Sequence, residues 1–465
     1  MQMRSGPMAI IVALFIVEIA AVFETTMIYV AMPTLIREFG DPLTAGWLVT
    51  AHMLVGAGVA VLAGRLGDIY GRRRVMLVLL AAGLIGSILS AVTKVFAIVL
   101  IGRALQGLSA AVLPLTIGVI RENLPEGRVP VAVGLMTTAA GAGTASGLVL
   151  GGAIIDTLNW HWLFVASAVL LGLALAAVAL VVPSREGTPP RQPIDWIEGL
   201  MPVPAIAAIL LGISMSKTHG WAEPAVGGLI VAGIVVLALW ARRSLAASEP
   251  FVDLRLLASR NVALANLAMV FFALGSMQSV FVMTTYAQNP VWTLAGLGLA
   301  ATIAGLIKLP SNILSFFAGP LAGWLQQKAG LRVPIVSGSI LMALGWVWAL
   351  GLPGSTVEVI LLLCVISFGT TIVNAAVPNV IVASVPQERT SEAIGTMAVV
   401  RGMFSGIGAQ IIALLLATGT LAEKGGAQLP SAEGFRLAMG WVIIATVVVA
   451  LSGLMIRARE RQPAQ

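Results

Sequence analysis

The feature that most constrains this chain is a succession of fourteen apolar segments separated by short polar breaks. A membrane-spanning helix needs about 20 predominantly apolar residues, and each segment is close to that length or longer. We therefore expect an all-α polytopic membrane protein with fourteen spans. The predicted spans lie near residues 8–36, 45–66, 75–93, 96–120, 130–155, 160–182, 198–215, 224–241, 261–286, 294–325, 334–352, 356–384, 392–417 and 435–456.

The composition supports a membrane protein and excludes several kinds of site. Hydrophobic residues make up 58% of the 465 residues and charged residues only 10%, whereas soluble domains carry roughly 25% charged residues. The one cysteine, Cys364, lies in an apolar run, which excludes a disulfide scaffold and CxxC metal sites. The three histidines are far apart in the sequence. We therefore expect neither a metal nor a cofactor.

The distribution of lysine and arginine predicts the orientation. With a cytoplasmic N-terminus, the cytoplasmic loops and helix ends carry nineteen of these residues and the opposite side carries five. Positive residues concentrate on the cytoplasmic side of membrane proteins, so both termini are predicted to be cytoplasmic and the protein to lie in the cytoplasmic (inner) membrane. The formal net charge of +7 then follows from topology, and no nucleic-acid partner is expected.

Polar loops and a weak repeat divide the chain. Loops at 183–197 and 242–260 bracket the seventh and eighth spans and leave six spans on either side. GRLGDIYGRRRV at 64–75 has a degraded counterpart in GWLQQKAGLRVP at 323–334. Two parallel six-helix halves are a transporter architecture. The predicted parts are an N-terminal six-helix bundle (1–190), two extra spans with linkers (191–258) and a C-terminal six-helix bundle (259–465).

The loop at 64–74 resembles the signature loop of the major facilitator superfamily. Its glycines permit a tight turn between two helices, its arginines hold the loop at the cytoplasmic face, and its aspartate can cap or pair locally. In the second copy Gln327 replaces the aspartate. The residues expected to form a structural and gating motif are Gly64, Asp68, Gly71, Arg72 and Arg73.

Further stretches resemble the fourteen-span drug:proton antiporters of that superfamily. ETTMIYVAMP at 24–33 is similar to their Asp-x-Thr…Ala-x-Pro pattern, with Glu24 in place of Asp, and RALQG at 103–107 is similar to their Arg-x-x-Gln-Gly motif. The fifth span has the spacing of the antiporter glycine motif, with Leu148 in place of its proline. The glycines that match are Gly134, Gly143, Gly147, Gly151 and Gly152, and of these Gly143, Gly147 and Gly151 are expected to belong to the structural and gating motif. The resemblance implies two six-helix bundles with two inserted helices, and alternating-access, proton-coupled multidrug efflux. A monomer is the default for this architecture.

Charged residues inside the spans point to the coupling site, because a central charge costs about 2.5–3.5 kcal/mol on insertion scales. Glu24 is the leading proton-coupling candidate, since a carboxyl group removed from water can load and release a proton near physiological pH. The alternative is a hydrogen-bonded core glutamate. Glu18 lies roughly 240° around the helix from Glu24 and is a second titrating group or a cavity wall residue. The resemblance implies proton relay for Arg103, and a role in tying helices together is equally open.

Polar stripes at helical spacing predict the substrate site. Lys308, Ser311, Asn312 and Ser315 form one stripe, which we expect to face an aqueous cleft unless Lys308 pairs with an acid such as Glu24. A second stripe runs from Ser367 through Thr370, Thr371 and Asn374, and interhelical hydrogen bonding is its alternative role. Arg401 either reaches the cleft or extends to the interface. The candidate substrate-binding residues are Glu24, His52, Lys308, Asn312, Asn374, Asn379 and Arg401.

These patterns predict proton-coupled export of small amphipathic organic compounds by alternating access. Its partners would be a small-molecule substrate, protons and the lipid bilayer. The alternative is transport of an organic anion by symport or exchange through Lys308 and Arg401, because the second-half spans carry these two cations and no acid in their central parts. We expect no enzyme activity, because the sequence has no catalytic constellation and no GxxxxGK[ST] loop. A channel fits less well, since duplicated halves with dispersed single charges favour alternating access.

Overall fold

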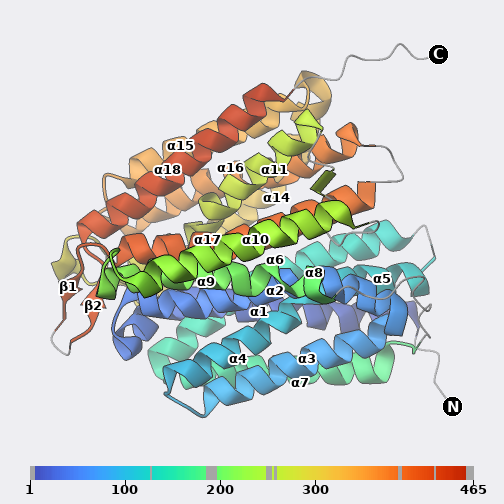
Figure 1. Cartoon of the computed structure of the whole chain (residues 1–465), viewed down its shortest axis with the longest axis horizontal. Helices are drawn as coiled ribbons and strands as arrows, with labels where there is room; N and C mark the ends of the chain where they lie inside the picture. The colour runs from blue at the N-terminus through green and yellow to red at the C-terminus, as the bar shows by residue number, and fades with distance from the viewer. Residues whose placement is uncertain are drawn as a thin grey trace.

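The computed structural model describes residues 6–125, 128–184, 196–247, 254–255, 259–385, 390–423 and 426–456. In these ranges the chain is almost entirely α-helical, and long helices lie side by side with similar directions (Figure 1). Thirteen helical segments of the described chain are long and apolar enough to cross a membrane, and Pro202–Ser216 is an apolar but shorter helix. The predicted all-α polytopic membrane fold is confirmed.

The helices follow the predicted spans closely. The first seven are α1 (Pro7–Phe39), α2 (Pro42–Tyr70), α3 (Arg72–Ala91), α4 (Phe96–Ser109), α5 (Leu113–Asn123), α6 (Val129–Thr157) and α7 (His161–Val181). Then come α8 (Trp196–Leu200), α9 (Pro202–His219) and α10 (Pro224–Ala246). The remainder are α11 (Arg260–Leu274), α12 (Ser279–Gln288), α13 (Ala301–Leu306), α14 (Leu309–Ala329), α15 (Arg332–Ala349), α16 (Thr356–Ser384), α17 (Thr390–Leu416) and α18 (Ala432–Met455). Two short strands, β1 (Leu421–Ala422) and β2 (Gln428–Leu429), pair antiparallel between α17 and α18.

Short 3-10 turns join helices that the sequence predicted as single spans. Ala110–Val112 links α4 to α5, and Ser276–Gln278 links α11 to α12. The predicted start of the tenth span at residue 294 is wrong, because α13 begins at Ala301. The reason is Asn289, whose side-chain amide donates to the Ala295 carbonyl oxygen at 2.8 Å and holds the preceding residues in a turn.

The repeated loops form the same kind of turn. Gly71 ends α2 with φ of 90°, and Gly330 ends α14 with φ of 89°. Residues with a Cβ atom rarely adopt such a conformation, so each turn favours glycine. The weak repeat between 64–75 and 323–334 therefore corresponds to two equivalent helix–turn–helix units.

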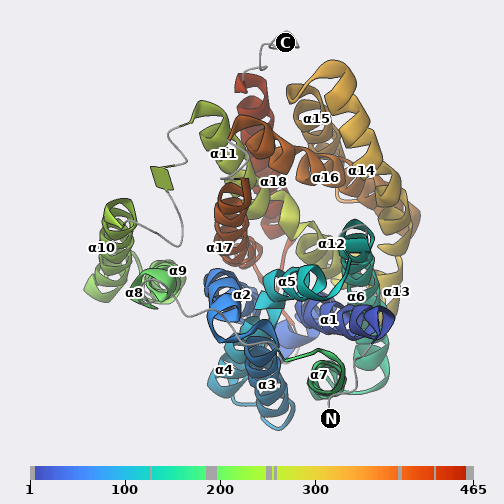
Figure 2. The same cartoon turned by 90° about the vertical axis from the view of Figure 1, so that its right-hand side faces the viewer.

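Two groups of helices are visible when the molecule is viewed end-on (Figure 2). Helices α1–α7 lie together in one half and α11–α18 in the other, with α8–α10 at one side. The groups meet where α2 packs on α17 and where α6 packs on α13. The predicted boundaries after residues 190 and 258 lie outside the described residues.

At the end of the molecule that carries β1 and β2 (Figure 1), side chains of both groups are buried together. A buried cluster there joins both groups, and its members include Met32, Leu48, Phe281, Ile412 and Met439. Thr284 Oγ1 donates to the Tyr29 carbonyl oxygen at 3.0 Å, which ties α12 to α1. We call this region, around 29–36 of α1 and 281–287 of α12, the closed end. The opposite end, with the turns at Gly71 and Gly330, is called the cavity end.

Candidate functional site

Two cavities lie where the two groups of helices face each other. The larger, about 960 Å³, is bounded by α6, α11, α12, α14, α16 and α17 together with the 3-10 turn at Ser276–Gln278. The smaller, about 550 Å³, is bounded by α1, α2, α5 and α17 and the same turn. Met277 and Arg401 line both, so the cavities adjoin there. The smaller cavity reaches Gly64 and Gly395, which are near the cavity end.

The larger cavity has a polar lining drawn from both groups of helices. The polar and charged residues that line it are Thr138, Thr144, Ser276, Ser279, Lys308, Asn312, Ser315, Ser367, Thr370, Thr371, Asn374 and Arg401. Most of both predicted stripes therefore faces one space. Ser311 is the exception, since it is fully buried and its hydroxyl donates to the Lys308 carbonyl oxygen at 2.8 Å.

Lys308 lies at a break in the helix rather than within a continuous span. It is the N-terminal flanking residue of α14, directly after the end of α13, and its side chain lines the larger cavity. Its ammonium group donates to Ser367 Oγ of α16. In the described part of the chain no carboxylate forms an ion pair with Lys308. The suggested pairing with Glu24 is therefore wrong.

Arg401 lies on the wall shared by the two cavities. Within the described ranges no hydrogen bond or ion pair joins it to another residue. Of the two alternatives left open by the sequence, the structure thus favours a side chain that reaches the cleft.

Glu24 occupies a different environment inside the first group of helices. Its side chain is fully buried and does not line either cavity. Three hydroxyls donate to its carboxyl group: Ser167 Oγ at 2.9 Å, Ser87 Oγ at 3.3 Å, and Ser109 Oγ. These serines come from α7, α3 and α4, and we call them the serine cage. In this structure the Glu24 carboxyl group is bonded to the serine cage and lies outside both cavity linings, so its predicted direct contact with substrate stays a prediction.

Arg103 supports the same region through main-chain contacts. Its Nε donates to the Leu48 carbonyl oxygen at 2.9 Å, and one Nη donates to the Glu24 carbonyl oxygen at 3.1 Å and to Gln106 Oε1 at 2.7 Å. Gln106 in turn donates to two hydroxyls of the serine cage. Arg103 therefore ties α4 to α1 and α2, and it contacts the backbone of Glu24 rather than its carboxylate.

Thr25 links the helix that carries Glu24 to the smaller cavity. It follows Glu24 in α1, lines the smaller cavity, and its Oγ1 lies 3.0 Å from His52 Nε2. His52 lines the same cavity although it is only 2% exposed. The coupling candidate is thus adjacent along α1 to a residue that lines the cavity.

Glu18 is a second buried acid on α1. It is 4% exposed, and its Oε1 has no hydrogen-bond partner among the described residues. Neither the serine cage nor a cavity includes it. As the helical spacing predicted, the two acids lie on different faces of the helix.

Asn379 is also placed away from the cavities. Its side-chain amide donates to Gln326 Oε1 at 2.8 Å, which joins α16 to α14. Neither cavity is lined by Asn379. The structure therefore places Asn379 outside both cavities, and its predicted contact with substrate stays a prediction.

The signature loop forms contacts within the first group of helices. Arg72 pairs with Asp68 at 2.6 Å and with Glu122 of α5 at 2.9 Å. Arg73 donates to the Ala179 carbonyl oxygen of α7. Gly64 lines the smaller cavity. The loop therefore anchors α2 and α3 to α5 and α7 at the cavity end.

The glycine motif brings α6 against α1, the helix that carries Glu24. A Cβ atom on Gly147 would lie 1.9 Å from Thr26 Oγ1, and one on Gly143 would lie 2.8 Å from Val22 Cβ. Gly151 similarly faces Val30. On another face of α6, Leu148 contacts the second group, since a Cβ atom on Gly305 would lie 2.3 Å from the Leu148 carbonyl oxygen.

The sequence reasoning missed the serine cage and the α1 and α6 contributions to the cavities. Each missed residue, such as Ser109, Thr25 or Thr138, is a single hydroxyl in a long apolar span. The only signal was polarity inside a span, which does not distinguish a ligand-facing hydroxyl from one bonded to its own helix.

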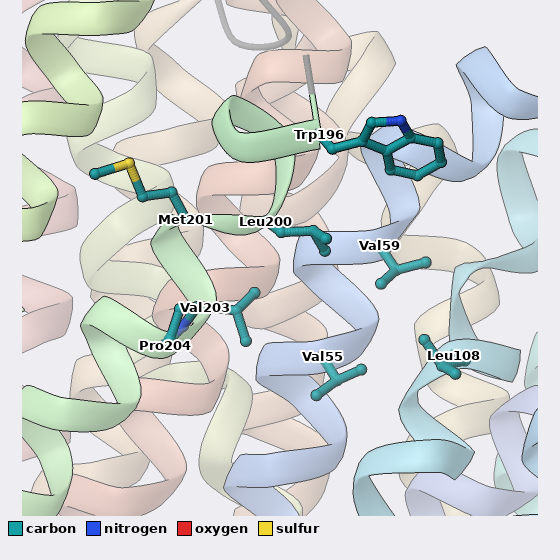
Figure 3. Close-up of a pocket in the computed structure, with 8 residues that line it drawn as sticks. All are labelled: Val55, Val59, Leu108, Trp196, Leu200, Met201, Val203 and Pro204. Atoms are coloured by element: carbon teal, nitrogen blue, oxygen red, sulfur yellow. The ribbon is translucent and has the colours of Figure 1, made fainter. Parts of the chain in front are cut away.

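A third cavity, about 560 Å³, lies between the inserted helices and α2 (Figure 3). Its walls are apolar and include Val55, Val59, Leu108, Trp196 and Leu200. None of the residues that line it is charged. It therefore lacks the groups that would fix the orientation of a polar substrate.

Comparison with known proteins identifies several relatives. The chain is 30% identical over 338 residues to the cephamycin export protein of Amycolatopsis lactamdurans, covering 70% of this chain and 67% of that protein. It is 24% identical to the tetracenomycin C resistance and export protein of Streptomyces glaucescens, covering 90% and 77%. It is 28% identical to a multidrug resistance protein B homolog of Mycobacterium tuberculosis, covering 70% of this chain and 60% of that relative. The matched region thus spans three fifths to three quarters of these proteins.

The fold has close counterparts among solved structures. The crystal structure of an auto-inhibited POT family peptide transporter matches with a TM-score of 0.66, covering 98% of this chain and 99% of that one at 15% identity. At this identity the likeness concerns the fold alone. Residues 14–409 match the sequence model described as Major Facilitator Superfamily. The chain belongs to the Major Facilitator Superfamily and is a multi-pass membrane transporter.

Proposed function

We propose that the chain is a proton-coupled antiporter that exports small amphipathic organic compounds, as in the fourteen-span drug:proton antiporters. The observation that carries this proposal is the fully buried Glu24 carboxyl group in its serine cage, one residue away from a cavity between the two groups of helices. Relatives named as export proteins for cephamycin and tetracenomycin C support the direction of transport.

The serine cage suits a carboxyl group that changes its protonation state. A serine hydroxyl can either donate or accept a hydrogen bond. The hydroxyls can therefore donate to the ionised carboxylate, and one of them can accept from the protonated form. No direct ion pair holds Glu24 in the charged state in the described structure, since Arg103 bonds to its main-chain oxygen. The cage can thus satisfy both protonation states, each with its own set of hydrogen bonds.

Coupling would pass along α1. Protonation of Glu24 changes the hydrogen bonds that fix this turn of α1, and the adjacent Thr25 forms part of the smaller cavity. Because α6 packs on the same helix with very close approach at Gly147, a small shift of α1 is transmitted to the wall of the larger cavity as well. Substrate and proton would then favour opposite arrangements of the two groups of helices.

The domain division and orientation belong to the same proposal. Residues 1–190 and 259–465 would be the two moving six-helix domains, with residues 191–258 as an inserted segment. The cavity end would face the cytoplasm, with both termini on that side of the inner membrane and the protein acting as a monomer. The structure would then correspond to the state that receives substrate from the cytoplasm.

A proton-flux assay tests the proposal. The purified chain is reconstituted in vesicles containing a pH indicator, and 2-naphthoate, 2-naphthamide and 2-naphthylmethylammonium are added in turn. We expect at least one compound to drive proton movement through the wild type and Glu24→Gln to reduce that movement at least about tenfold, because the amide cannot carry the proton. Binding of the compound should persist in this variant.

The matched control is Glu18→Gln, which makes the same change on the same helix outside the serine cage. Loss of flux in Glu18→Gln with normal flux in Glu24→Gln would move the proton site to Glu18. Undiminished flux in both variants, or no flux with any compound alongside intact transport, would contradict proton coupling at these acids.

A further inference from the structure

The charged side chains that line the two cavities are all cationic. The ionisable residues that line the two cavities are Lys308 and Arg401, with His52 at the edge of the smaller cavity. No aspartate or glutamate is among the described residues that line either cavity. A cavity for an organic cation would need an acid or a cage of aromatic rings, and neither is present among these lining residues.

The two cations are not neutralised by the protein. Lys308 bonds to the neutral hydroxyl of Ser367, and Arg401 has no hydrogen-bond or ion-pair partner in the described part of the chain. Two unpaired cations that line one cavity within a membrane protein repel each other and retain unused hydrogen-bond donors. An anion bound in the cavity would reduce this repulsion and accept hydrogen bonds from the free donors.

Two acids on helices that bound the cavities, Glu24 of α1 and Asp156 of α6, are held by other contacts. Glu24 is held by the serine cage and faces away from the cavities. Asp156 accepts from the backbone amides of Ala301 and Thr302, at 2.9 Å and 2.7 Å. Neither acid is placed to supply the missing negative charge, so a bound anion would supply it.

The remaining walls suit the rest of such a molecule. Asn312 and Asn374 can donate further hydrogen bonds beside Lys308 in the larger cavity. Met53, Leu113, Met277 and Val399 give the smaller cavity an apolar surface next to Arg401. A ligand with an anionic head and an apolar body would match both cavities.

We propose that the substrate is an amphipathic organic acid whose carboxylate binds between Lys308 and Arg401 and whose apolar body occupies the smaller cavity. This inference rests on the proposed export function and names its substrate class. Arginine and lysine both bind carboxylates through charge-assisted hydrogen bonds. Proton coupling at Glu24 and anion binding at Lys308 are then carried by separate sites.

Equilibrium binding to the purified full-length chain tests this inference. The probes are radiolabelled 2-naphthoate and its neutral and cationic counterparts, 2-naphthamide and 2-naphthylmethylammonium, which share the same ring system. We expect the acid to bind most tightly. Lys308→Gln and Arg401→Gln should each weaken its binding about ten- to a hundredfold, as expected for loss of a hydrogen bond to a charged group, and should leave binding of the amide unchanged.

Two control variants separate charge at the site from folding and from general electrostatics. Lys308→Arg keeps the charge in the cavity and should retain binding within a few fold. Lys328→Gln removes the same charge from α14 outside the cavities, where the Lys328 ammonium group lies over the Trp324 ring, and should have no effect. Normal elution of the variants in gel filtration shows that they are folded.

Three results would overturn the inference: equal or tighter binding of the amine, no binding of the acid, or acid binding that does not depend on Lys308 and Arg401. None of them bears on Glu24, because this assay involves no proton gradient. Conversely, selective acid binding combined with unchanged proton flux in Glu24→Gln would uphold the substrate class and reject the proposed coupling site.

Discussion

The closed end and the cavity end contain the same helices, but they are held differently. Near the closed end α2 and α17 touch closely: Thr50 Oγ1 donates to Gln410 Oε1 at 3.0 Å. Further along, Gly64 of α2 and Gly395 of α17 both line the smaller cavity. The proposed alternating access would require the first kind of contact to break while the second region closes. The contacts that join the two groups at the closed end are therefore the ones that set the balance between states.

Three of the contacts that cross between the groups near the closed end differ in kind and can be compared. The first is backbone packing, where Gly305 of α13 lies against the Leu148 carbonyl oxygen of α6. The second is the cap that Asp156 of α6 provides for the start of α13. The third is the exposed ion pair between Arg37 and Glu423. We expect their contributions to the stability of the closed end to decrease in that order. Each contribution can be tested separately.

The largest increase in opening of the closed end is expected for Gly305→Ala. Its Cβ atom would lie 2.3 Å from the Leu148 carbonyl oxygen, and this backbone oxygen cannot rotate away. Overpacking of this kind costs about 1–3 kcal/mol, so opening of the closed end should increase roughly five- to a hundredfold. The measurement is the rate at which a membrane-impermeant maleimide labels Val30→Cys in a Cys364→Ser background, because Val30 is fully buried beside Leu148 and Ala301.

The matched control for that substitution is Gly323→Ala in α14. A Cβ atom at Gly323 has no atom within 4 Å in its surroundings, so labelling of Val30→Cys should not change. If both alanine variants label at the wild-type rate, close backbone packing does not hold the closed end shut. The comparison between the two ends would then need another explanation.

The fold could be predicted from the sequence to a large extent because membrane insertion restricts it so strongly. Apolar segments of about 20 residues must form helices to satisfy their backbone groups, so most spans were placed within a few residues. The start of the tenth span was wrong because Leu294 through Ala300 are as apolar as a helix but are held in a turn by Asn289. A single side-chain hydrogen bond of this kind leaves no periodic signal in the sequence.

The second-largest increase in opening of the closed end is expected for Asp156→Asn. The carboxylate accepts from the Ala301 and Thr302 amides and from the Thr302 hydroxyl at 2.6 Å. An asparagine side chain has one acceptor oxygen and no charge, which we expect to cost about 1 kcal/mol at this exposed position. Labelling of Val30→Cys should rise roughly fivefold. Thr302→Val, which removes only the hydroxyl donor, should give a smaller rise, and a larger rise in that variant would argue against the cap.

The candidate site was less predictable than the fold, for a geometric reason. The stripe from Lys308 to Ser315 indicated a helix face, but it did not indicate that α14 begins next to Lys308. Nor did it indicate that the Ser311 hydroxyl would donate to the Lys308 carbonyl oxygen instead of facing the cavity. Glu24 was recognised from its surroundings in the sequence, whereas its partners Ser87, Ser109 and Ser167 come from three other helices. The packing of the whole bundle determines which helices are in contact. Short sequence patterns do not show which helices those are.

The smallest effect is expected for the ion pair that lies furthest from the core. Arg37 Nε donates to Glu423 Oε2 at 2.9 Å, but the two side chains are 41% and 26% exposed. Exposed pairs contribute about 0–1 kcal/mol and are screened by salt. Arg37→Gln should therefore raise the labelling rate by no more than about fivefold in dilute buffer, and high salt should remove the difference.

A double-mutant cycle with Glu423→Gln isolates this pair, because the second substitution should add nothing once the first has been made. The salt dependence also distinguishes the kinds of contact, since Gly305→Ala acts through packing and should be insensitive to salt. If Arg37→Gln instead opened the closed end as much as Gly305→Ala does, charge at the surface rather than backbone packing would set the balance. The ranking of the three contacts would then be reversed, and the exposed pair would become the gate.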